Sequence, residues 1–221
     1  MKEQLQVILD FSKSIINEYC DDYNNYWELL KDLKNIIIVM GNNLDKNKYD
    51  EVETNIWVSK TAKVDNTARI VGPCIIDDDS EIRVNAFIRG NVIIGKRCVV
   101  GNSSEIKNSI LFDESKIPHF NYVGDSILGY KAHFGAGSLT SNVKSDESFV
   151  NVMLNSNKHT TNMKKIGAVV GDNVEIGCNA VLTPGTIVGR GSTIYPLTMV
   201  RGEIGSNKIV KSINEIVDKR M

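Results

Sequence analysis

Two basic side chains and one histidine in the middle of the chain have the chemistry to act on an anionic substrate. Arg89 and Lys107 are eighteen residues apart, and each directly follows an aliphatic residue. Arginine and lysine commonly bind phosphate. His119 comes shortly after Lys107, and histidine is the side chain best suited to take up a proton near neutral pH. For all three residues, a structural role on the surface is the alternative that these positions alone leave open.

A six-residue repeat must position these side chains. Aliphatic residues recur at every sixth position from Val58 to Ile106, with Phe112 continuing the series, and again from Val170 to Val200. Small residues stand two positions before most of them. Neither the period of a strand nor that of a helix explains a sustained step of six, whereas one short side of a prism does. Three sides make one coil, and coils stack at roughly the strand spacing of 4.8 Å.

The repeat places Arg89 and Lys107 on the same edge of the prism, one coil apart. Two cations held that close repel each other unless an anion lies between them, and a phosphate would fit there. The phase slips further along the chain, because the step from Val123 to Leu128 is five residues and the steps on either side are six. His119 lies just before this slip, and a local break in a regular pattern is where functional residues are expected.

These periods predict an all-β fold, a single-stranded parallel β-helix of hexapeptide repeats over residues 54–205. A loop near residues 143–165, rich in Asn, Ser and Lys, interrupts the repeat and is expected to leave the prism. A sandwich of short strands is the alternative, but sandwich strands do not hold a fixed six-residue phase. The spacing by itself does not set the hand of the coil.

The two flanks carry helical patterns. Residues 1–53 are expected to form a helical segment followed by a linker, with helices near residues 2–19 and 25–40. Residues 206–221 are expected to form a C-terminal helix, because their apolar residues fall on one helical face. These apolar residues are Ile209, Val210, Ile213, Ile216 and Val217.

Charge and cysteine content exclude several classes of function. Lys plus Arg total 26 and Asp plus Glu total 27, so the net charge of −1 gives no basic surface for nucleic acid or an acidic membrane. No apolar run is long enough to cross a bilayer, and the N-terminus does not have the pattern of a signal peptide. The four cysteines form no metal-binding pair, so free thiols, no bound metal and a cytoplasmic location are expected.

Three segments in the middle of the chain resemble the acetyltransferase domain of bifunctional UDP-N-acetylglucosamine pyrophosphorylase/glucosamine-1-phosphate acetyltransferases. The similarity is closer to the archaeal sugar-1-phosphate nucleotidylyltransferase/acetyltransferases. Residues 100–107, 116–125 and 134–142 carry it, and its most specific part is His-x-x-Tyr-x-Gly-Asp followed by Gly-Ala-Gly. A weaker similarity continues to about Arg201. The resemblance implies a left-handed coil, a homotrimer with active sites between neighbouring prisms, and a role in UDP-N-acetylglucosamine biosynthesis.

The resemblance also implies a reaction and the residues that perform it. Acetyl-CoA, as co-substrate, would give its acetyl group to the amine of an amino sugar 1-phosphate of the glucosamine or galactosamine type. His119 matches the general base that takes the proton from the attacking amine. The residues that match sugar-phosphate contacts are Arg89, Lys107, Tyr122, His133 and Asn142. The residues that match the acetyl-CoA path are Ala136, Cys178 and Pro196.

Three departures from the family pattern keep other hypotheses open. His133 stands where the bacterial enzymes have an asparagine, and Ser148 and Asn151 stand where the archaeal relatives have lysines. A nucleotide-linked amino sugar or another amine is therefore an alternative acceptor. A non-catalytic trimeric scaffold is the third hypothesis. No glycine-rich loop with a following basic residue occurs near the N-terminus, so no nucleotidyltransferase activity is expected.

Overall fold

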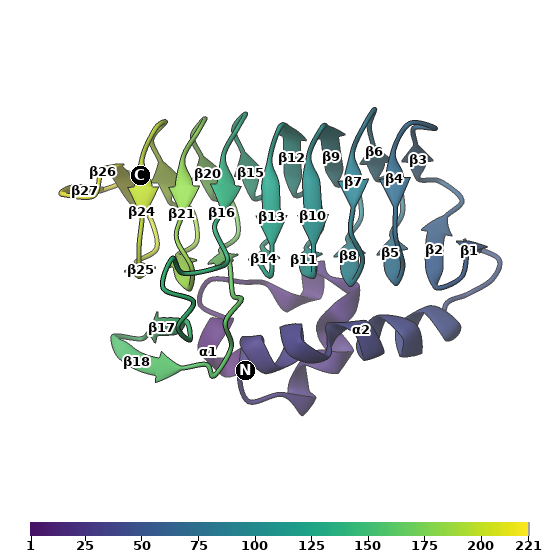
Figure 1. Cartoon of the computed structure of the whole chain (residues 1–221), viewed down its shortest axis with the longest axis horizontal. Coiled ribbons are helices and arrows are strands. Elements are labelled where there is room, and N and C mark those ends of the chain that lie inside the picture. Colours follow the sequence, from purple (N-terminus) through teal and green to yellow (C-terminus); the bar gives the residue numbers. More distant parts are fainter. Residues whose placement is uncertain (221) are drawn as a thin grey trace.

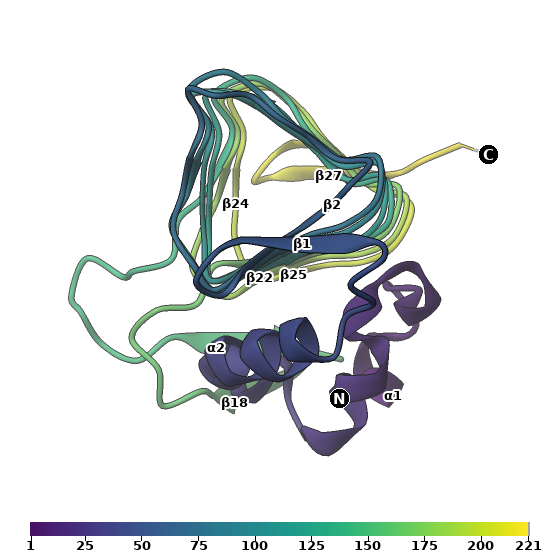
Figure 2. The ribbon, with the colours of Figure 1, turned by 90° about the vertical axis from the view of Figure 1, so that its right-hand side faces the viewer.

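The computed structural model describes residues 1–220 and forms a left-handed parallel β-helix with a triangular cross-section, which confirms the predicted fold class (Figures 1 and 2). Branched aliphatic side chains at the repeat positions point into the prism and are buried. Such residues favour strands because their side chains pack well on a pleated surface. Each coil buries its aliphatic residues only against the coils next to it.

Three sheets form the sides of the prism, and within each sheet the coils pair in parallel. Sheet A contains β1 (Tyr49–Glu53), β2 (Ile56–Ser59), β5 (Cys74–Ile76), β8 (Val92–Ile94), β11 (Ser109–Leu111), β14 (Ile127–Leu128), β19 (Ala168–Val170), β22 (Thr186–Val188) and β25 (Glu203–Ile204). Sheet B contains β3 (Lys63–Val64), β6 (Glu81–Ile82), β9 (Val99–Asn102), β12 (Lys116–His119), β15 (His133–Phe134), β20 (Glu175–Ile176), β23 (Thr193–Ile194), β26 (Lys208–Ser212) and β27 (Glu215–Asp218). Sheet C contains β4 (Arg69–Ile70), β7 (Phe87–Ile88), β10 (Glu105–Lys107), β13 (Tyr122–Gly124), β16 (Leu139–Thr140), β21 (Val181–Leu182) and β24 (Met199–Val200).

The phase of the repeat slips earlier than the sequence pattern predicted. Leu111, not Phe112, is the inward residue, because it pairs with Ile94 and Leu128 in sheet A and lies in the core of the prism. Phe112 points outward, where its ring packs edge to face against Phe11 with centroids 5.7 Å apart. Two corners between sheet C and sheet A are therefore one residue short, between Ile106 and Leu111 and between Val123 and Leu128.

The N-terminal segment covers the outer face of sheet A (Figure 2). It contains α1 (Lys2–Leu5), two 3-10 helices (Phe11–Lys13 and Ile15–Asp22) and α2 (Tyr26–Asn42). Buried residues on its inner side pack against the outward residues of sheet A, which are Ile75, Ile93, Ile110, Ile127, Val169 and Ile187. This second core fixes the N-terminal segment to the prism, so only sheets B and C keep uncovered outer faces.

The single helix predicted near residues 2–19 is wrong, because this stretch is broken into short pieces. The carboxylate of Asp10 accepts hydrogen bonds from the amide and hydroxyl of Ser12, and Ser14 caps the next 3-10 helix. Such local side-chain bonds compete with continuous helix. The Asp10 amide also donates to Asp172 in the prism at 2.8 Å, which holds the chain in its broken path.

Two further predictions for the flanks are wrong. The expected linker contains β1, which pairs antiparallel with β2 at the first edge of sheet A. The expected C-terminal helix is instead the antiparallel hairpin of β26 and β27, and β26 adds to the prism because Val210 pairs with Ile194. Edge strands offer unpaired backbone groups, and Ile and Val favour strands, so the open edges decided both conformations.

Residues 143–165 leave the prism between β16 and β19 and return to it (Figure 2). They contain the antiparallel hairpin of β17 (Asn151–Leu154) and β18 (Asn157–Thr160), which lies beside α2. The rings of Trp27 on α2 and His159 on β18 are 5.9 Å apart. None of the helices in residues 1–220 has the length and hydropathy needed to span a membrane.

Candidate active site

The corner between sheets B and C carries four of the singled-out residues in line. His119 ends β12, and parallel pairing places Ala136, Cys178 and Pro196 at the same corner in the next three coils. Backbone bonds run along the corner from coil to coil. The amide of Gly137 donates to the carbonyl of His119 at 3.1 Å, the amide of Asn179 to Ala136 at 2.9 Å, and the amide of Leu197 to Cys178 at 2.9 Å. We call His119, Ala136, Cys178 and Pro196 the His119 ladder, which is about 14 Å long at strand spacing.

The His119 ladder is open to solvent. His119, Cys178 and Pro196 are exposed and Ala136 is half-buried. The ring of His119 has no hydrogen-bond partner within residues 1–220, so both ring nitrogens are free to bind other groups. An open line of small side chains that ends at a free imidazole suits a long, narrow substrate with its reactive end at His119.

Two apolar residues flank the ladder in a strained conformation. Phe120 is 64% exposed with φ +52°, and Leu197 is 80% exposed with φ +60°. The equivalent turn positions in the two coils between them are Gly137 and Asn179, which tolerate positive φ far better than bulky residues do. Exposed apolar side chains in this conformation are unfavourable for an isolated chain, which points to a contact at this corner.

Asn121, which sequence reasoning missed, holds the turn that carries His119. Its side chain is 2% exposed and accepts a hydrogen bond from the His119 amide at 3.0 Å. It donates to the carbonyls of Gly135 at 2.8 Å and Ser138 at 3.0 Å in the next coil. Asn121 therefore positions the backbone of His119 against two coils. The only signal in the sequence was its place two residues after the histidine.

The outer face of sheet C brings together the residues predicted to hold the sugar phosphate. Pairing of Ile88 with Ile106 places Arg89 and Lys107 in neighbouring coils, as the repeat predicted. Lys107 in turn pairs with Gly124. The hydroxyl of Tyr122 accepts a hydrogen bond from the side chain of Asn142 at 3.2 Å.

Carboxylates, however, already accompany both cations. Arg89 forms an ion pair with Glu105 at 2.5 Å, and Lys107 forms one with Asp125 at 3.0 Å. The anion that the stacking of Arg89 and Lys107 requires is thus supplied by the protein. A bound phosphate would have to share or displace these carboxylates.

Asp125 is the centre of a buried network at the corner between sheets C and A. Its side chain is 6% exposed and accepts from Lys107, from Asn108 at 2.9 Å, and through a short bond from Asn142. Asn108 also donates to the carbonyl of Leu30 on α2 at 3.3 Å. We call Lys107, Asn108, Asp125 and Asn142 the Asp125 network. The phase slip between Val123 and Leu128 was the signal that could have identified Asp125.

His133 lies apart from this set. It is on the outer face of sheet B, where its Nδ1 is 2.7 Å from Glu175 Oε2. Tyr122 belongs to sheet C and Asn142 follows the sheet C strand β16, so a single chain does not bring His133 to the same face. Within residues 1–220, no three His, Cys, Asp or Glu side chains are grouped as a metal site.

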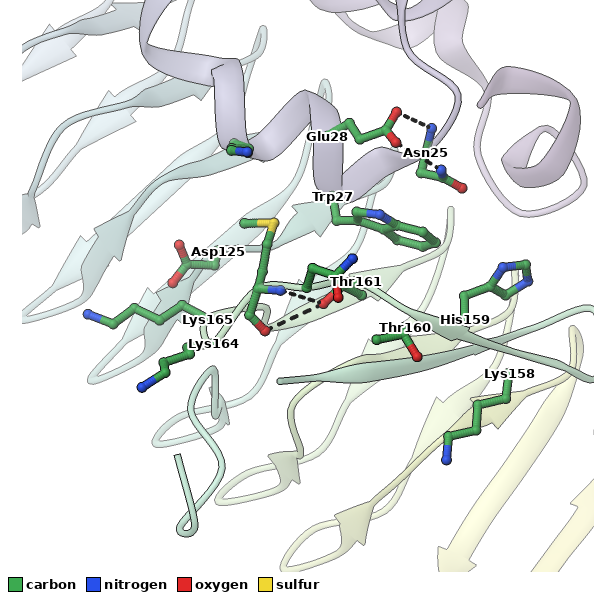
Figure 3. Close-up of a pocket in the computed structure, with 13 residues that line it drawn as sticks. Asn25, Trp27, Glu28, Asp125, Lys158, His159, Thr160, Thr161, Lys164 and Lys165 are labelled. Atoms are coloured by element: carbon green, nitrogen blue, oxygen red, sulfur yellow. Dashed lines mark hydrogen bonds between the residues drawn. The ribbon is translucent and has the colours of Figure 1, made fainter. Parts of the chain in front are cut away.

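A pocket of about 830 Å³ adjoins the Asp125 network, between α2 and the returning end of the 143–165 segment (Figure 3). Asp125 lines it at one end, and Trp27 and His159 line it at the other. Its basic lining residues are Lys31, Lys158, Lys164 and Lys165. We call it the lysine pocket. Sequence reasoning could not place it, because its two walls are far apart in the chain.

Comparison with known proteins supports the repeat assignment. Residues 167–202 match the family model "Bacterial transferase hexapeptide (six repeats)", and residues 70–152 match "GMPPB C-terminal domain". This chain is a hexapeptide-repeat protein. It resembles the bifunctional protein GlmU of Methanococcus vannielii, with 33% identity over 100% of this chain and 54% of the relative.

A second relative is the bifunctional sugar-1-phosphate nucleotidylyltransferase/acetyltransferase of Sulfurisphaera tokodaii, with 31% identity over 86% of this chain and 50% of the relative. The chain thus spans about half the length of the curated relatives it matches. Among solved structures, a mutant GDP-perosamine N-acetyltransferase from Caulobacter crescentus, in complex with CoA and GDP-perosamine, matches with 14% identity and a TM-score of 0.30. That match covers 72% of this chain and 54% of the other, and a likeness this distant gives no information about the site.

Proposed function

We propose that this protein is an acetyl-CoA-dependent N-acetyltransferase that acts on an amino sugar phosphate, with His119 as the general base. The observation that carries the proposal is the meeting of two features at one corner. The His119 ladder provides an open line of small residues, and the face of sheet C with Lys107 and Tyr122 begins beside it. The Sulfurisphaera tokodaii relative is named a nucleotidylyltransferase/acetyltransferase, and the similarity to this chain covers 50% of that relative.

In this proposal acetyl-CoA lies along the His119 ladder, with its thioester at the His119 end. Ala136 supports the acetyl end, and Cys178 and Pro196 lie beside the pantetheine arm. Their small side chains leave the corner unobstructed. In this proposal the thioester reaches the imidazole because no larger side chain of the ladder lies between them.

The acceptor lies across the outer face of sheet C. Tyr122 and Asn142 contact the sugar, and Arg89 and Lys107 contact its 1-phosphate. An acceptor phosphate would replace Glu105 as the partner of Arg89 and would share Lys107 with Asp125. Since exposed ion pairs of this kind contribute little to stability, Arg89 is readily released to the phosphate.

The reaction needs one proton acceptor. The neutral sugar amine attacks the thioester carbonyl carbon, the new C–N bond forms, and the C–S bond breaks. His119 takes the proton from the amine nitrogen and passes it to the CoA sulfur, which leaves as a thiol. Holding both substrates at one corner supplies a large part of the rate, because it removes the entropy cost of bringing them together.

A homotrimer fits the same surfaces. The N-terminal segment covers sheet A, so neighbouring copies have sheets B and C on which to pack. Phe120 and Leu197, the two exposed apolar residues beside the ladder, would then be covered by a neighbour. His133, which is outside the acceptor face of its own chain, would reach the acceptor of the next. Such a trimer would work in the cytoplasm, where acetyl-CoA and sugar phosphates are available.

The experiment that tests the proposal is release of free thiol from acetyl-CoA in the presence of glucosamine 1-phosphate or galactosamine 1-phosphate. We expect release to require the sugar, and His119→Ala to lower kcat by about 10²–10⁴-fold, the usual contribution of a general base. Circular dichroism of His119→Ala should match the unchanged protein, because the side chain is exposed and unbonded.

Three further results separate the alternatives. An unchanged rate in His119→Ala would contradict its role as the base. No acetyl-CoA binding and no thiol release with any amino sugar would favour the non-catalytic scaffold. Incubation with a nucleoside triphosphate and a sugar 1-phosphate should release no pyrophosphate.

A further inference from the structure

The lysine pocket carries basic side chains that the protein does not neutralise. Within residues 1–220, no carboxylate lies within 4.0 Å of the ammonium groups of Lys31, Lys158, Lys164 or Lys165. This contrasts with Arg89 and Lys107 on sheet C, which are both paired. Surplus positive charge in a concave site favours an anionic ligand.

The two carboxylates that line the pocket offset this charge only in part. Glu28 accepts hydrogen bonds from the amide and the side chain of Asn25, each at 3.2 Å, at the start of α2. Asp125 is engaged by Lys107, Asn108 and Asn142. Four exposed lysines therefore line a pocket in which, among residues 1–220, Asp125 is paired with Lys107 and Glu28 is the one carboxylate without a cationic partner, so positive charge is in excess.

The far end of the pocket is aromatic. The rings of Trp27 and His159 are 5.9 Å apart and inclined at 46°, and Figure 3 shows both at the opposite end from Lys164, Lys165 and Asp125. Lys31 lies one helical turn after Trp27, on the same side of α2. Planar bases bind to aromatic side chains by stacking, and cations beside them bind phosphates. A volume of about 830 Å³ lies within the range of small-molecule sites.

The pocket continues the acceptor face. Asp125 belongs both to the Asp125 network and to the wall of the pocket. The returning chain is fastened to this corner, because the amide of Ile166 donates to the Asn142 carbonyl at 3.0 Å and the amide of Gly167 to the Asp125 carbonyl at 2.9 Å. Lys164 and Lys165 directly precede these bonds and are thus held at the corner.

The direction of the acceptor follows from this continuity. In the proposed function the amine lies towards His119 and the phosphate towards Lys107, so the phosphate is the part of the acceptor nearer the Asp125 corner. A group attached to the phosphate on the side away from the sugar passes the Asp125 corner and enters the lysine pocket. It meets Lys164 and Lys165 first and then Trp27 and His159.

We infer that the lysine pocket holds the distal phosphate and nucleoside of the acceptor, so that the preferred acceptor is a nucleoside diphosphate-linked amino sugar. This inference rests on the proposed function, because it extends the acceptor at the same site. The acetyl transfer itself is unchanged. The distal phosphate lies by Lys164 and Lys165, and the base lies against the aromatic wall.

Binding of UDP to the full chain tests the pocket directly, by calorimetry at low salt. GDP, ADP and dTDP serve as further probes of the base, and pyrophosphate and uridine as the separated halves. We expect at least one nucleoside diphosphate to bind at least tenfold more tightly than either half. The double variant Lys164→Gln/Lys165→Gln should weaken this binding at least tenfold. Lys144→Gln, a loop lysine outside the pocket that pairs with Asp146, should not change it.

Acetyl transfer then tests the acceptor. The kcat/KM for UDP-glucosamine should exceed that for glucosamine 1-phosphate at least tenfold, and the double variant should remove this preference. UDP should inhibit competitively against the amino sugar and not against acetyl-CoA. Loss of binding in the double variant with an unaltered circular dichroism spectrum would locate the effect in the pocket.

Failure of the inference and failure of the proposed function give different results. His119-dependent acetylation of glucosamine 1-phosphate, with no nucleoside diphosphate binding, would overturn the inference and leave the proposed function. Nucleoside diphosphate binding that needs Lys164 and Lys165, with no acetylation of any amino sugar, would keep the nucleotide site and overturn the proposed function. Pyrophosphate binding as tight as UDP binding would overturn the nucleoside part.

Discussion

The two corners that bound sheet C are built in opposite ways. The His119 corner keeps its regular turns, exposes His119, Cys178 and Pro196, and leaves the imidazole without a hydrogen-bond partner among residues 1–220. The Asp125 corner is one residue short in two successive coils, buries Asp125, and gives it three side-chain donors. The outer face of sheet C therefore lies between an exposed corner and a buried corner.

The difference shows where this prism leaves side chains exposed to reactants and where it buries them with full hydrogen bonding. A reacting group must approach and leave, so it belongs on the open corner. A buried carboxylate needs full satisfaction of its oxygens, because an unpaired buried charge is costly. The closed corner also joins the prism to α2 through Asn108, and it carries the return of the 143–165 segment.

The strongest test of this comparison is to remove the centre of the closed corner. Asp125→Ala leaves Lys107 without its partner and removes the acceptor for Asn108 and Asn142, so we expect a loss of about 2–4 kcal/mol in the free energy of unfolding. Urea denaturation followed by circular dichroism measures it. Asp146→Ala, an exposed carboxylate in the loop, is the control and should shift the midpoint little. Equal effects of the two variants would show that the corner is not rigidified by Asp125.

A smaller effect, on reactivity, is expected at the open corner. Cys178 is exposed and the other three thiols are buried, and burial raises the pKa of Cys20 to about 12 and also raises the pKa of Cys74 and Cys98. The thiolate is the reactive form, so these three react slowly at pH 8. N-ethylmaleimide should modify one thiol of the folded chain, and saturating acetyl-CoA should slow that reaction at least tenfold.

Mass spectrometry of timed samples follows this labelling. Cys178→Ser should lose the rapid reaction, which identifies the modified residue. An unchanged labelling rate in the presence of acetyl-CoA would mean that the co-substrate does not lie along the His119 ladder.

The smallest effect on stability is expected between the two corners, at the exposed pair of Arg89 and Glu105. Arg89→Gln should leave the urea midpoint unchanged, because exposed ion pairs are screened by water and ions. It should raise the KM for the amino sugar phosphate more than it lowers kcat, since Arg89 is proposed to hold the phosphate. A large drop in the midpoint would assign Arg89 to the closed, structural part of the sheet.

The prism and the stacking of Arg89 on Lys107 could be predicted from the sequence, because the six-residue repeat is a local pattern that recurs in every coil. The partners of these cations were not predictable in the same way. Glu105 and Asp125 pair with Arg89 and Lys107 through side-chain conformations that the repeat does not specify. Phe112 was misplaced because Leu111 and Phe112 are adjacent and both apolar, and contact with Phe11 on the distant N-terminal segment decides between them.

The C-terminal error has the same origin. Ile209, Val210, Ile216 and Val217 fit a helical face and a hairpin equally well by spacing. The open edge of β23, a tertiary feature, selects the strand. The lysine pocket could not be predicted, because it forms through contact between α2 and β18, which no periodic pattern in the sequence indicates.

The two shortened corners have a consequence for how such a chain changes over generations. Each is one residue shorter than the repeating unit, and the strand that follows it pairs in the regular register. Deletions at corners are therefore absorbed locally, whereas a deletion within a strand would turn its inward side chains outward. Shortening one corner can therefore make room for a helix and a loop beside it. Such a change can alter ligand binding at that corner while the other coils keep their structure.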